Sequence, residues 1–335
     1  MISSWHNLRR SAWKRALAAF SIEEGIHQIS PPQSFEGGEE EYDARIGGAN
    51  RADLLRCGHG AWRLVTHYTT RPMRTVLELG AGGGTCSLGL IEAAPASSLL
   101  ITDTSPSFLR LIQRKCAAAG LVAKQPRYAT LAGEALDLLP ADSVDAIVIA
   151  SALHHVFDWQ GFLRVAATRL RRGGVLAIQE PFRAGNLMMG VAIDIALSPL
   201  WPRDAVLSEE DETRLRRCRD SIYLLSNSHV EKRGEDKHCF ELSEMIAASD
   251  AAGFAGTAFH SNAHFHNLVA ADLVNRQASC SLVGYLASFL RDHHRISDDG
   301  MAKLTAHLFP ILQNLDASYS RGDGPPLLGC MVFRK

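Results

Sequence analysis

The sequence lacks the cysteine spacing of a disulfide framework or a zinc ribbon. Its seven cysteines are scattered along 335 residues, and no two of them form a CxxC pair. An odd number of dispersed cysteines favours free, mostly buried thiols in a reducing compartment. We therefore expect a cytoplasmic protein with no disulfides and no bound metal.

The sequence also lacks an excess of charge of one sign and a long apolar run. Its 35 Lys and Arg nearly balance its 36 Asp and Glu, for a net charge of −1. Such a surface has no global field to attract nucleic acid or anionic lipid. No stretch reaches the roughly 18 apolar residues that span a bilayer, and the closest, 187–201, contains Asp194. We expect no nucleic-acid partner, no integral membrane segment and a small neutral or amphipathic substrate.

The first 70 residues are predicted to form an N-terminal helical segment and cap. Residues 1–20 contain four basic and no acidic residues, with apolar side chains separated by polar ones. This pattern favours an amphipathic helix packed on the protein, with a weak membrane-surface contact as the alternative. Residues 28–50 are rich in glycine, proline and acidic residues, which predicts a loop. A helix is expected over 51–69.

From residue 75 onward, strands and helices alternate. Short apolar segments predict strands at 75–79, 99–102, 127–131, 144–150 and 175–179, with helices between them. This order predicts an α/β fold with a mostly parallel sheet covered on both faces. The alternation is interrupted at about 182–238 and 267–325, and further strands are expected at 256–264 and 327–333. An apolar stripe over 301–315 predicts a helix kinked at Pro310.

The strongest chemical signal is the segment VLELGAGGG at 76–84, in which a strand runs into a glycine-rich turn before a helix. Glycines let the backbone approach a ligand closely. A dinucleotide site of the GxGxxG type would place its last glycine at position 85, which is Thr85. Glu78 would repel a pyrophosphate but would favour a ligand ammonium. S-adenosylmethionine carries an ammonium and a sulfonium and no phosphate, so it fits better than a nicotinamide dinucleotide.

Two further acids follow the next strands. Asp103 ends the second strand, where a carboxylate can accept both hydroxyls of a ribose. Its alternative role, capping the next helix, is already available to Ser105. Glu134 follows the third strand and is a candidate acceptor for an adenine amino group, with an exposed loop acid as the alternative.

The chain resembles the class I S-adenosylmethionine-dependent methyltransferases that act on quinones, sterols and other small molecules. The matching segments cover about 70–254 and are ELGAGGG (78–84), TDTSPSFL (102–109), GEALDLLP (133–140), VDAIVIASALHHV (144–156), LRRGGVLAIQEPF (170–182) and CFELSEMIAASDAAGF (239–254). The resemblance implies a Rossmann-like sheet with an antiparallel last strand, and a methyltransferase domain over 71–335 with helical insertions. It implies S-adenosylmethionine as cofactor and a small-molecule acceptor, and it is compatible with a homodimer.

The resemblance also assigns cofactor-binding roles to individual residues. Glu78 and the turn would hold the methionine end, Asp103 the ribose and Glu134 the adenine. Thr104 departs from the family, which usually has an aliphatic residue there against the adenine ring. Tyr42 would belong to the N-terminal segment that closes over the cofactor in this group, with an ordinary turn residue as the alternative. The full expected set is Glu78, Gly80, Ala81, Gly82, Gly84, Asp103, Thr104, Glu134, Ala135, Ser151 and Tyr42.

Histidines are the candidate catalytic groups. An oxygen acceptor gains from a general base, most often histidine, and His154 and His155 follow the fourth strand. Either could be the base, or both could be hydrogen-bonded loop histidines. Further candidates are Glu180, Asp194 and His238. His264 and His266 would share one strand face, where a metal site is conceivable but polar pocket lining is the expected role.

Two functions remain in view. The first is methyl transfer to a small acceptor, in particular to an oxygen of an apolar or amphipathic metabolite. The second is a protein of the same fold that binds S-adenosylmethionine without transferring its methyl group, either an accessory subunit or a non-methylating enzyme. A third, nicotinamide-dependent oxidoreduction, is disfavoured by Thr85 and Glu78.

Overall fold

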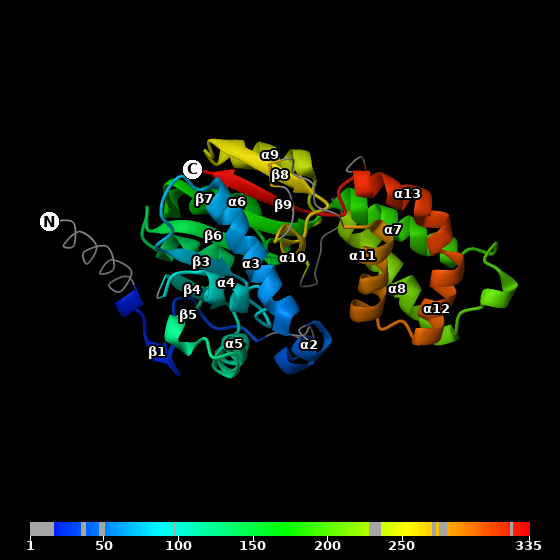
Figure 1. Cartoon of the computed structure of the whole chain (residues 1–335), viewed down its shortest axis with the longest axis horizontal. Helices are drawn as coiled ribbons and strands as arrows, with labels where there is room; N and C mark the ends of the chain where they lie inside the picture. The colour runs from blue at the N-terminus through cyan, green and yellow to red at the C-terminus, as the bar shows by residue number, and fades with distance from the viewer. Residues whose placement is uncertain are drawn as a thin grey trace.

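The fold was analysed in a computed structural model of the chain, drawn in Figure 1. It describes residues 17–34, 38–46, 51–96, 98–227, 236–269, 273–274, 280–321 and 324–335. The amphipathic helix expected over 1–20 falls almost entirely outside these ranges. Within them, no helix is both long and apolar enough to cross a membrane.

A nine-stranded sheet in the order β1-β2-β5-β4-β3-β6-β7-β9-β8 forms the centre of the molecule. The run from β2 to β7 is parallel, whereas β1, β9 and β8 pair antiparallel with their neighbours. This confirms the Rossmann-like sheet with an antiparallel last strand. The strands are β1 (Ile22–Glu23), β2 (Ile26–Gln28), β3 (Val76–Leu79), β4 (Leu99–Asp103), β5 (Arg127–Thr130), β6 (Val144–Ala150), β7 (Leu170–Pro181), β8 (Gly256–Ser261) and β9 (Leu328–Arg334).

Helices cover both faces of the sheet (Figure 1). One face packs against α3 (Arg51–Tyr68), α4 (Ser87–Ala93), α5 (Pro106–Ala118) and α10 (Phe265–Leu268). The other packs against η2 (Gly133–Leu138), α6 (Trp159–Arg169) and α9 (Leu242–Ala251). The central strands are continuous apolar runs because both of their faces are buried. The start of α5 follows its sequence signal, since Ser105 accepts a hydrogen bond from the backbone of Phe108 and Pro106 is the first helical residue.

The two predicted insertions pack on each other as a separate helical lobe beside the sheet (Figure 1). It consists of α7 (Arg183–Ala196), η4 (Arg203–Ala205), α8 (Glu209–Ser226), α11 (Leu282–Ser288), η5 (Phe289–His293), α12 (Asp298–His307) and α13 (Phe309–Arg321). The lobe has its own core, in which Met189 and Ile193 of α7 meet Leu215 of α8 and Leu304 of α12. Segments about a hundred residues apart therefore fold as one unit.

Three local expectations were wrong. Residues 28–50 are not one loop, because β2 reaches Gln28 and α2 (Glu39–Ile46) follows with an acidic first turn that suits the helix dipole. The stripe over 301–315 is not one kinked helix, since α12 ends at His307 and Pro310 lies near the start of α13, where the missing amide costs no helical hydrogen bond. The strand expected over 256–264 ends at Ser261, and His264 caps α10 instead.

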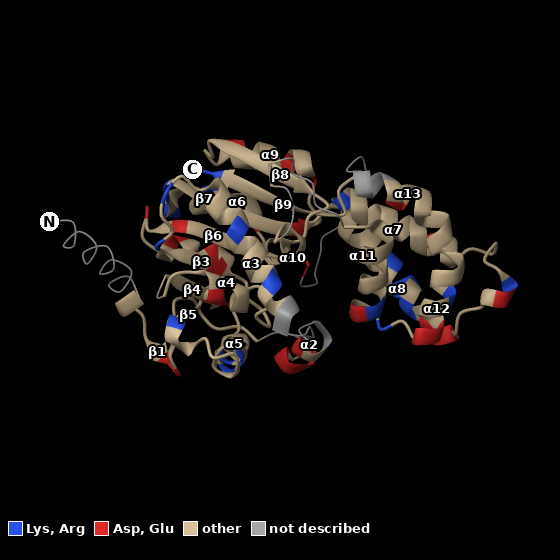
Figure 2. Cartoon of the chain, viewed as in Figure 1, with Lys and Arg blue, Asp and Glu red and all other residues tan. Residues whose placement is uncertain are grey.

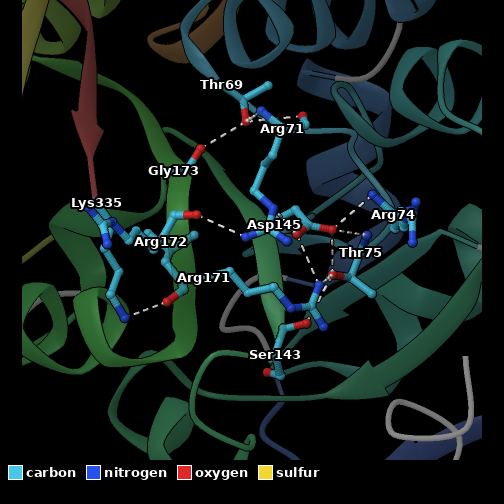
Figure 3. Close-up of polar contacts among 11 residues, drawn as sticks. Thr69, Arg71, Arg74, Thr75, Ser143, Asp145, Arg171, Arg172, Gly173 and Lys335 are labelled. Atoms are coloured by element: carbon cyan, nitrogen blue, oxygen red, sulfur yellow. Dashed lines mark hydrogen bonds and ion pairs between the residues drawn. The ribbon is translucent and has the colours of Figure 1, made fainter. Parts of the chain in front are cut away.

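A buried carboxylate joins the amino-terminal ends of the central strands (Figure 3). Asp145 accepts hydrogen bonds from the backbone of Arg74 and Thr75 at 2.9 and 3.0 Å. Arg71 and Arg171 approach its other oxygen at 3.1 and 3.0 Å. The side chain of Asp145 is only 1% exposed, so these partners replace the water that its charge would otherwise need. This cluster lies at the opposite end of the strands from the glycine turn.

Candidate active site

The glycine turn lies where the strand order reverses, between β3 and β6 with β4 on the other side. Open α/β sheets bind ligands at such a switch point, outside the carboxyl ends of the strands. Gly80 and Gly82 have φ of +69° and +49°, which suits glycine. A Cβ at Gly80 would come within 2.4 Å of the Cβ of Ala152 after β6. The turn therefore brings bare backbone to the edge where two strands diverge.

Asp103 is fixed at the end of β4 by two backbone amides. Its Oδ2 accepts a hydrogen bond from Gly82 at 2.8 Å, and its Oδ1 accepts one from Ser105 at 2.9 Å. Burial raises the pKa of Asp103, and these hydrogen bonds offset part of the rise. Each carboxylate oxygen can accept more than one hydrogen bond. The side chain is thus held in one orientation and retains acceptor capacity for a ligand.

Glu78 lies under the turn and is 1% exposed. Its Oε2 has no hydrogen-bond partner among the residues that the structure describes. Burial raises the pKa of Glu78 to about 8; the nearby Ser87 hydroxyl lowers it in part, and the neighbouring Cys57 and Asp103 add to the rise. A buried acid with an unused oxygen is suited to a positively charged ligand, which would favour its ionised form.

Helix α2, from the N-terminal part of the chain, covers the glycine turn. It appears as an acidic segment in Figure 2. Tyr42 Cε1 would be the nearest atom, at 3.9 Å, to a Cβ on Gly82. Asp43 pairs with Lys115 of α5, whose Nζ also donates to the carbonyl of Gly83 at 2.8 Å. Glu39 accepts from the hydroxyl of Ser105 at 2.6 Å. The structure therefore brings Tyr42 to the glycine turn, next to Asp103.

The residues expected around an adenine follow β4 and β5. Thr104 directly follows Asp103 and is half-buried, and its carbonyl accepts a hydrogen bond from the backbone of Gln33 at 2.9 Å. Glu134 and Ala135 lie in η2, after β5. Glu134 is exposed, and its Oε1 accepts from the amide of Phe157 at 2.9 Å. The cofactor contacts of these three residues stay predictions.

The loop after β6 is held by the end of β7. Ser151 has φ of +52°, and its backbone amide donates to the carbonyl of Gln179 at 2.8 Å. Glu180 Oε1 accepts from the amides of Ala152 and Leu153 at 2.9 and 2.6 Å. The other oxygen of Glu180 lies 2.6 Å from His154 Nδ1. Glu180 therefore fixes this loop through both of its oxygens.

His154 is enclosed by carboxylates on both sides. Its Nε2 lies 3.3 Å from Asp236, and its side chain is 14% exposed. Burial lowers the pKa of His154, but Glu180 and Asp236 outweigh burial and raise it to about 10. An imidazolium has no free lone pair to accept a proton, so a base role for His154 is disfavoured by this geometry and stays only a prediction. His155 is more exposed, at 42%, and its Nδ1 lies 3.5 Å from Asp236.

Of the other candidate catalytic residues, His238 lies beside this loop and Asp194 lies apart from it. His238 Nε2 is 3.0 Å from the carbonyl of Phe157. Asp194 lies in the helical lobe, where Tyr223 and Arg219 contact its two oxygens at 2.5 and 3.3 Å. Asp236, which no sequence pattern indicated, meets the two histidines from about 80 residues further along the chain. Lys115 likewise contacts α2 without any local pattern that indicates it.

Comparison with known proteins identifies the central segment. Residues 77–176, from β3 into β7, match a family model described as a methyltransferase domain. Residues 77–176 are thus identified as a methyltransferase domain. The methyl donor typical of this family is S-adenosylmethionine. The expected family, fold class and cofactor type are therefore confirmed for this domain.

Two curated proteins and a solved structure show the range of relatives. Trans-aconitate 2-methyltransferase of Rhodococcus jostii is 26% identical over 146 residues, which are 44% of this chain and 53% of that protein. Reducing polyketide synthase Preu2 of Preussia isomera is 32% identical over 128 residues, 35% of this chain and 5% of that protein. The chain thus spans about half or less of the curated relatives it matches. An S-adenosylmethionine-dependent methyltransferase from Mesorhizobium loti superposes with a TM-score of 0.42 at 19% identity, covering 84% of this chain and all of that one.

Proposed function

We propose that this methyltransferase domain moves a methyl group from S-adenosylmethionine to a small-molecule acceptor, in particular to an oxygen of an apolar or amphipathic metabolite. The observation that carries the proposal is the pair of buried carboxylates at neighbouring strand ends. Asp103 is oriented by two amides, and Glu78 keeps an oxygen without a partner among the described residues. These groups fit a ligand that has a ribose at one end and an ammonium at the other.

The residues of the chain would bind the cofactor and orient the acceptor rather than activate the methyl group. Bound at this turn, S-adenosylmethionine supplies a methyl group on a sulfonium that needs no further activation. Asp103 would accept hydrogen bonds from the ribose hydroxyls, and Glu78 would balance the positive charge. Tyr42 and α2 would cover the turn and exclude water. Much of the rate in such a reaction comes from holding the acceptor close to the methyl carbon.

The helical lobe is the proposed cap over the acceptor, within a domain spanning 71–335. Its η5 contacts α2, and the charge of His293 contributes to lowering the pKa of Asp236, which contacts His154 and His155. Arg295, just after η5, pairs with Glu41 of α2 at 2.8 Å. The lobe, the N-terminal segment and the loop after β6 therefore converge on one edge of the sheet.

The test is incubation of the purified chain with methyl-labelled S-adenosylmethionine and a metabolite extract, followed by mass spectrometry. We expect a labelled product heavier by one methyl group, and none with Asp103→Ala under the same conditions. The competing proposal is a protein that binds the cofactor without transferring the methyl group, which the carboxylate clamp on His154 favours. Tight cofactor binding with no labelled product from any extract would contradict transfer and support that alternative.

A further inference from the structure

A thiol and two imidazoles meet on the face of the sheet that α3 and α10 cover. Cys57 comes from α3, and His264 and His266 come from the start of α10. The candidate ligand atoms of the three side chains all lie within 4.8 Å of one another. Cys57 is buried and both histidines are half-buried. The three come from segments that are two hundred residues apart, so only the fold brings them together.

Close helix packing sets this arrangement. A Cβ at Gly60 would lie 1.7 Å from the carbonyl oxygen of Phe265, so only glycine permits α3 to come this close to α10. The amide of Phe265 is also tied to the sheet, because it donates to Gln179 Oε1 at 2.8 Å. Cys57 and the two histidines are therefore held by a rigid contact between two helices and the end of β7.

The hydrogen bonds around Gln179 indicate that the rings of His264 and His266 point toward one shared position. Gln179 must use its oxygen for Phe265, so its Nε2 is a donor, and it lies 3.1 Å from His264 Nε2. A neutral His264 then carries its hydrogen on Nδ1. That atom lies 2.5 Å from His266 Nδ1, and the amide of His266 is also 3.2 Å away. The amide and the ring nitrogen of His266 thus both crowd His264 Nδ1, and a cation between the two rings would separate the two ring nitrogens.

We propose that Cys57, His264 and His266 bind a divalent transition metal, with Zn²⁺ as the best fit. One thiolate and two imidazoles form a donor set typical of zinc. Zinc–ligand distances of about 2.0–2.3 Å place tetrahedral ligands roughly 3.3–3.7 Å apart, so the two ring nitrogens would move apart slightly. Cys86 lies beside Cys57, but it is not one of the three mutually close donors. Binding would release the Cys57 thiol proton to solvent. The hydrogen of His264 would move from Nδ1 to Nε2, and Gln179 Nε2 would turn from His264 toward the Ser151 hydroxyl, to which it also donates at 3.2 Å.

This site is independent of methyl transfer, although it adjoins the cofactor site. Cys57 interacts electrostatically with Glu78 under the glycine turn. A metal here would tie α3 to α10 and stabilise the wall behind that turn. It replaces the expectation from sequence that the chain binds no metal, since an isolated Cys57 and a histidine pair 207 residues later carry no recognisable spacing.

Co²⁺ titration of chelator-treated full-length protein tests the site, because thiolate-bound Co²⁺ absorbs strongly in the near ultraviolet. We expect one Co²⁺ per chain with this absorption, displaced by Zn²⁺. Cys57→Ser should abolish the band, and His266→Gln should weaken binding at least tenfold. Cys280→Ser and His155→Gln are matched controls outside the cluster and should bind like the wild type.

The absence of the thiolate band in the wild type would overturn the proposal, as would its persistence in Cys57→Ser. Folding of each variant is checked by circular dichroism. If Cys57→Ser fails to fold, the proposal is tested by the melting temperatures of the wild type and the remaining variants with and without Zn²⁺. Zn²⁺ should raise the melting temperature of the wild type and of Cys280→Ser but not that of His266→Gln, and an equal rise in all three would contradict the assignment. None of these readouts depends on S-adenosylmethionine.

Discussion

His154 shows how surrounding charges decide the role of a side chain. Glu180 and Asp236 lie 2.6 and 3.3 Å from its two ring nitrogens. These carboxylates raise the pKa of His154 to about 10 in spite of its burial. The raised pKa favours the cationic ring at neutral pH, and in that form His154 would hold the loop after β6 in place rather than accept a proton from an acceptor.

Replacing His154 by glutamine is expected to lower the free energy of unfolding at pH 7 by about 2 kcal/mol, the scale of a hydrogen bond to a charged group. The pKa of histidine rises from about 6.5 when unfolded to about 10 in the fold. Its contribution is therefore complete below pH 6.5 and is lost as the pH rises through 10. Denaturant unfolding of both proteins at several pH values measures this difference.

His59→Gln is the control, because His59 is 36% exposed beside Glu92 on the α3–α4 surface. We expect it to change stability by less than about 1 kcal/mol. If His154→Gln keeps full stability but loses turnover at saturating substrate, then His154 acts in the reaction and the structural role is wrong.

The sequence was sufficient to predict residues whose role follows from their position at the end of a strand. The glycine turn and Asp103 lie where the pattern of strand, turn and helix placed them, and Ser105 caps α5 as expected. Asp236 and Cys57 were not predictable as partners of histidines, because their contacts are made between segments distant in the chain. Local pattern carries no information about such pairs.

At the scale of elements, Asp145 joins three strands through one carboxylate (Figure 3). It is 1% exposed and contacts Arg71 and Arg171 as well as backbone at the start of β3. Asp145→Ala would leave two guanidinium groups without their carboxylate in a poorly hydrated place. We expect a loss of roughly 3–5 kcal/mol in the free energy of unfolding, as for a broken buried ion pair. Urea unfolding followed by circular dichroism measures it.

Asp142→Ala provides the comparison at the same end of β6. Its carboxylate pairs with Lys335 at 2.9 Å but is 68% exposed, so solvent screens the interaction. We expect a change of less than about 1 kcal/mol. Equal losses in both variants would show that the buried cluster contributes no more than a surface pair.

The sequence predicted the central strands well because they are short apolar runs between turn signals. It failed for α2, whose eight residues include only two apolar side chains beyond alanine, Tyr42 and Ile46. Contacts with α5 and with the glycine turn hold that helix instead, as the pairing of Asp43 with Lys115 shows. The break before α13 was also missed, because Pro310 suits the start of a helix as well as a kink within one.

At the scale of the whole molecule, one buried acid connects the two insertions that form the helical lobe. Asp211 of α8 accepts hydrogen bonds from the amide and hydroxyl of Ser297, at 2.9 and 2.6 Å, at the start of α12. Burial raises the pKa of Asp211, but the hydrogen bonds from Ser297 and Ser208 outweigh it and lower the pKa overall.

Asp211→Asn is expected to destabilise the lobe by about 1–3 kcal/mol at pH 7. A lowered carboxyl pKa contributes stability above the unfolded value of about 3.9, and this contribution disappears as the pH falls through the folded value. The difference from wild type should therefore shrink below about pH 4. Asp220→Asn, at an exposed position of α8, should show no such pH-dependent difference, and a constant difference for Asp211→Asn at all pH values would contradict the account.

The most direct test of the whole account is calorimetry of the purified chain with S-adenosylmethionine and with its demethylated product. The account predicts that both bind at one site per chain. Asp103→Ala should weaken binding by about 1–3 kcal/mol through loss of charge-assisted hydrogen bonds, whereas Asp250→Ala, on the exposed side of α9, should bind like the wild type. Failure of the wild type to bind either compound would contradict the assignment of the glycine turn and its two carboxylates as a cofactor site.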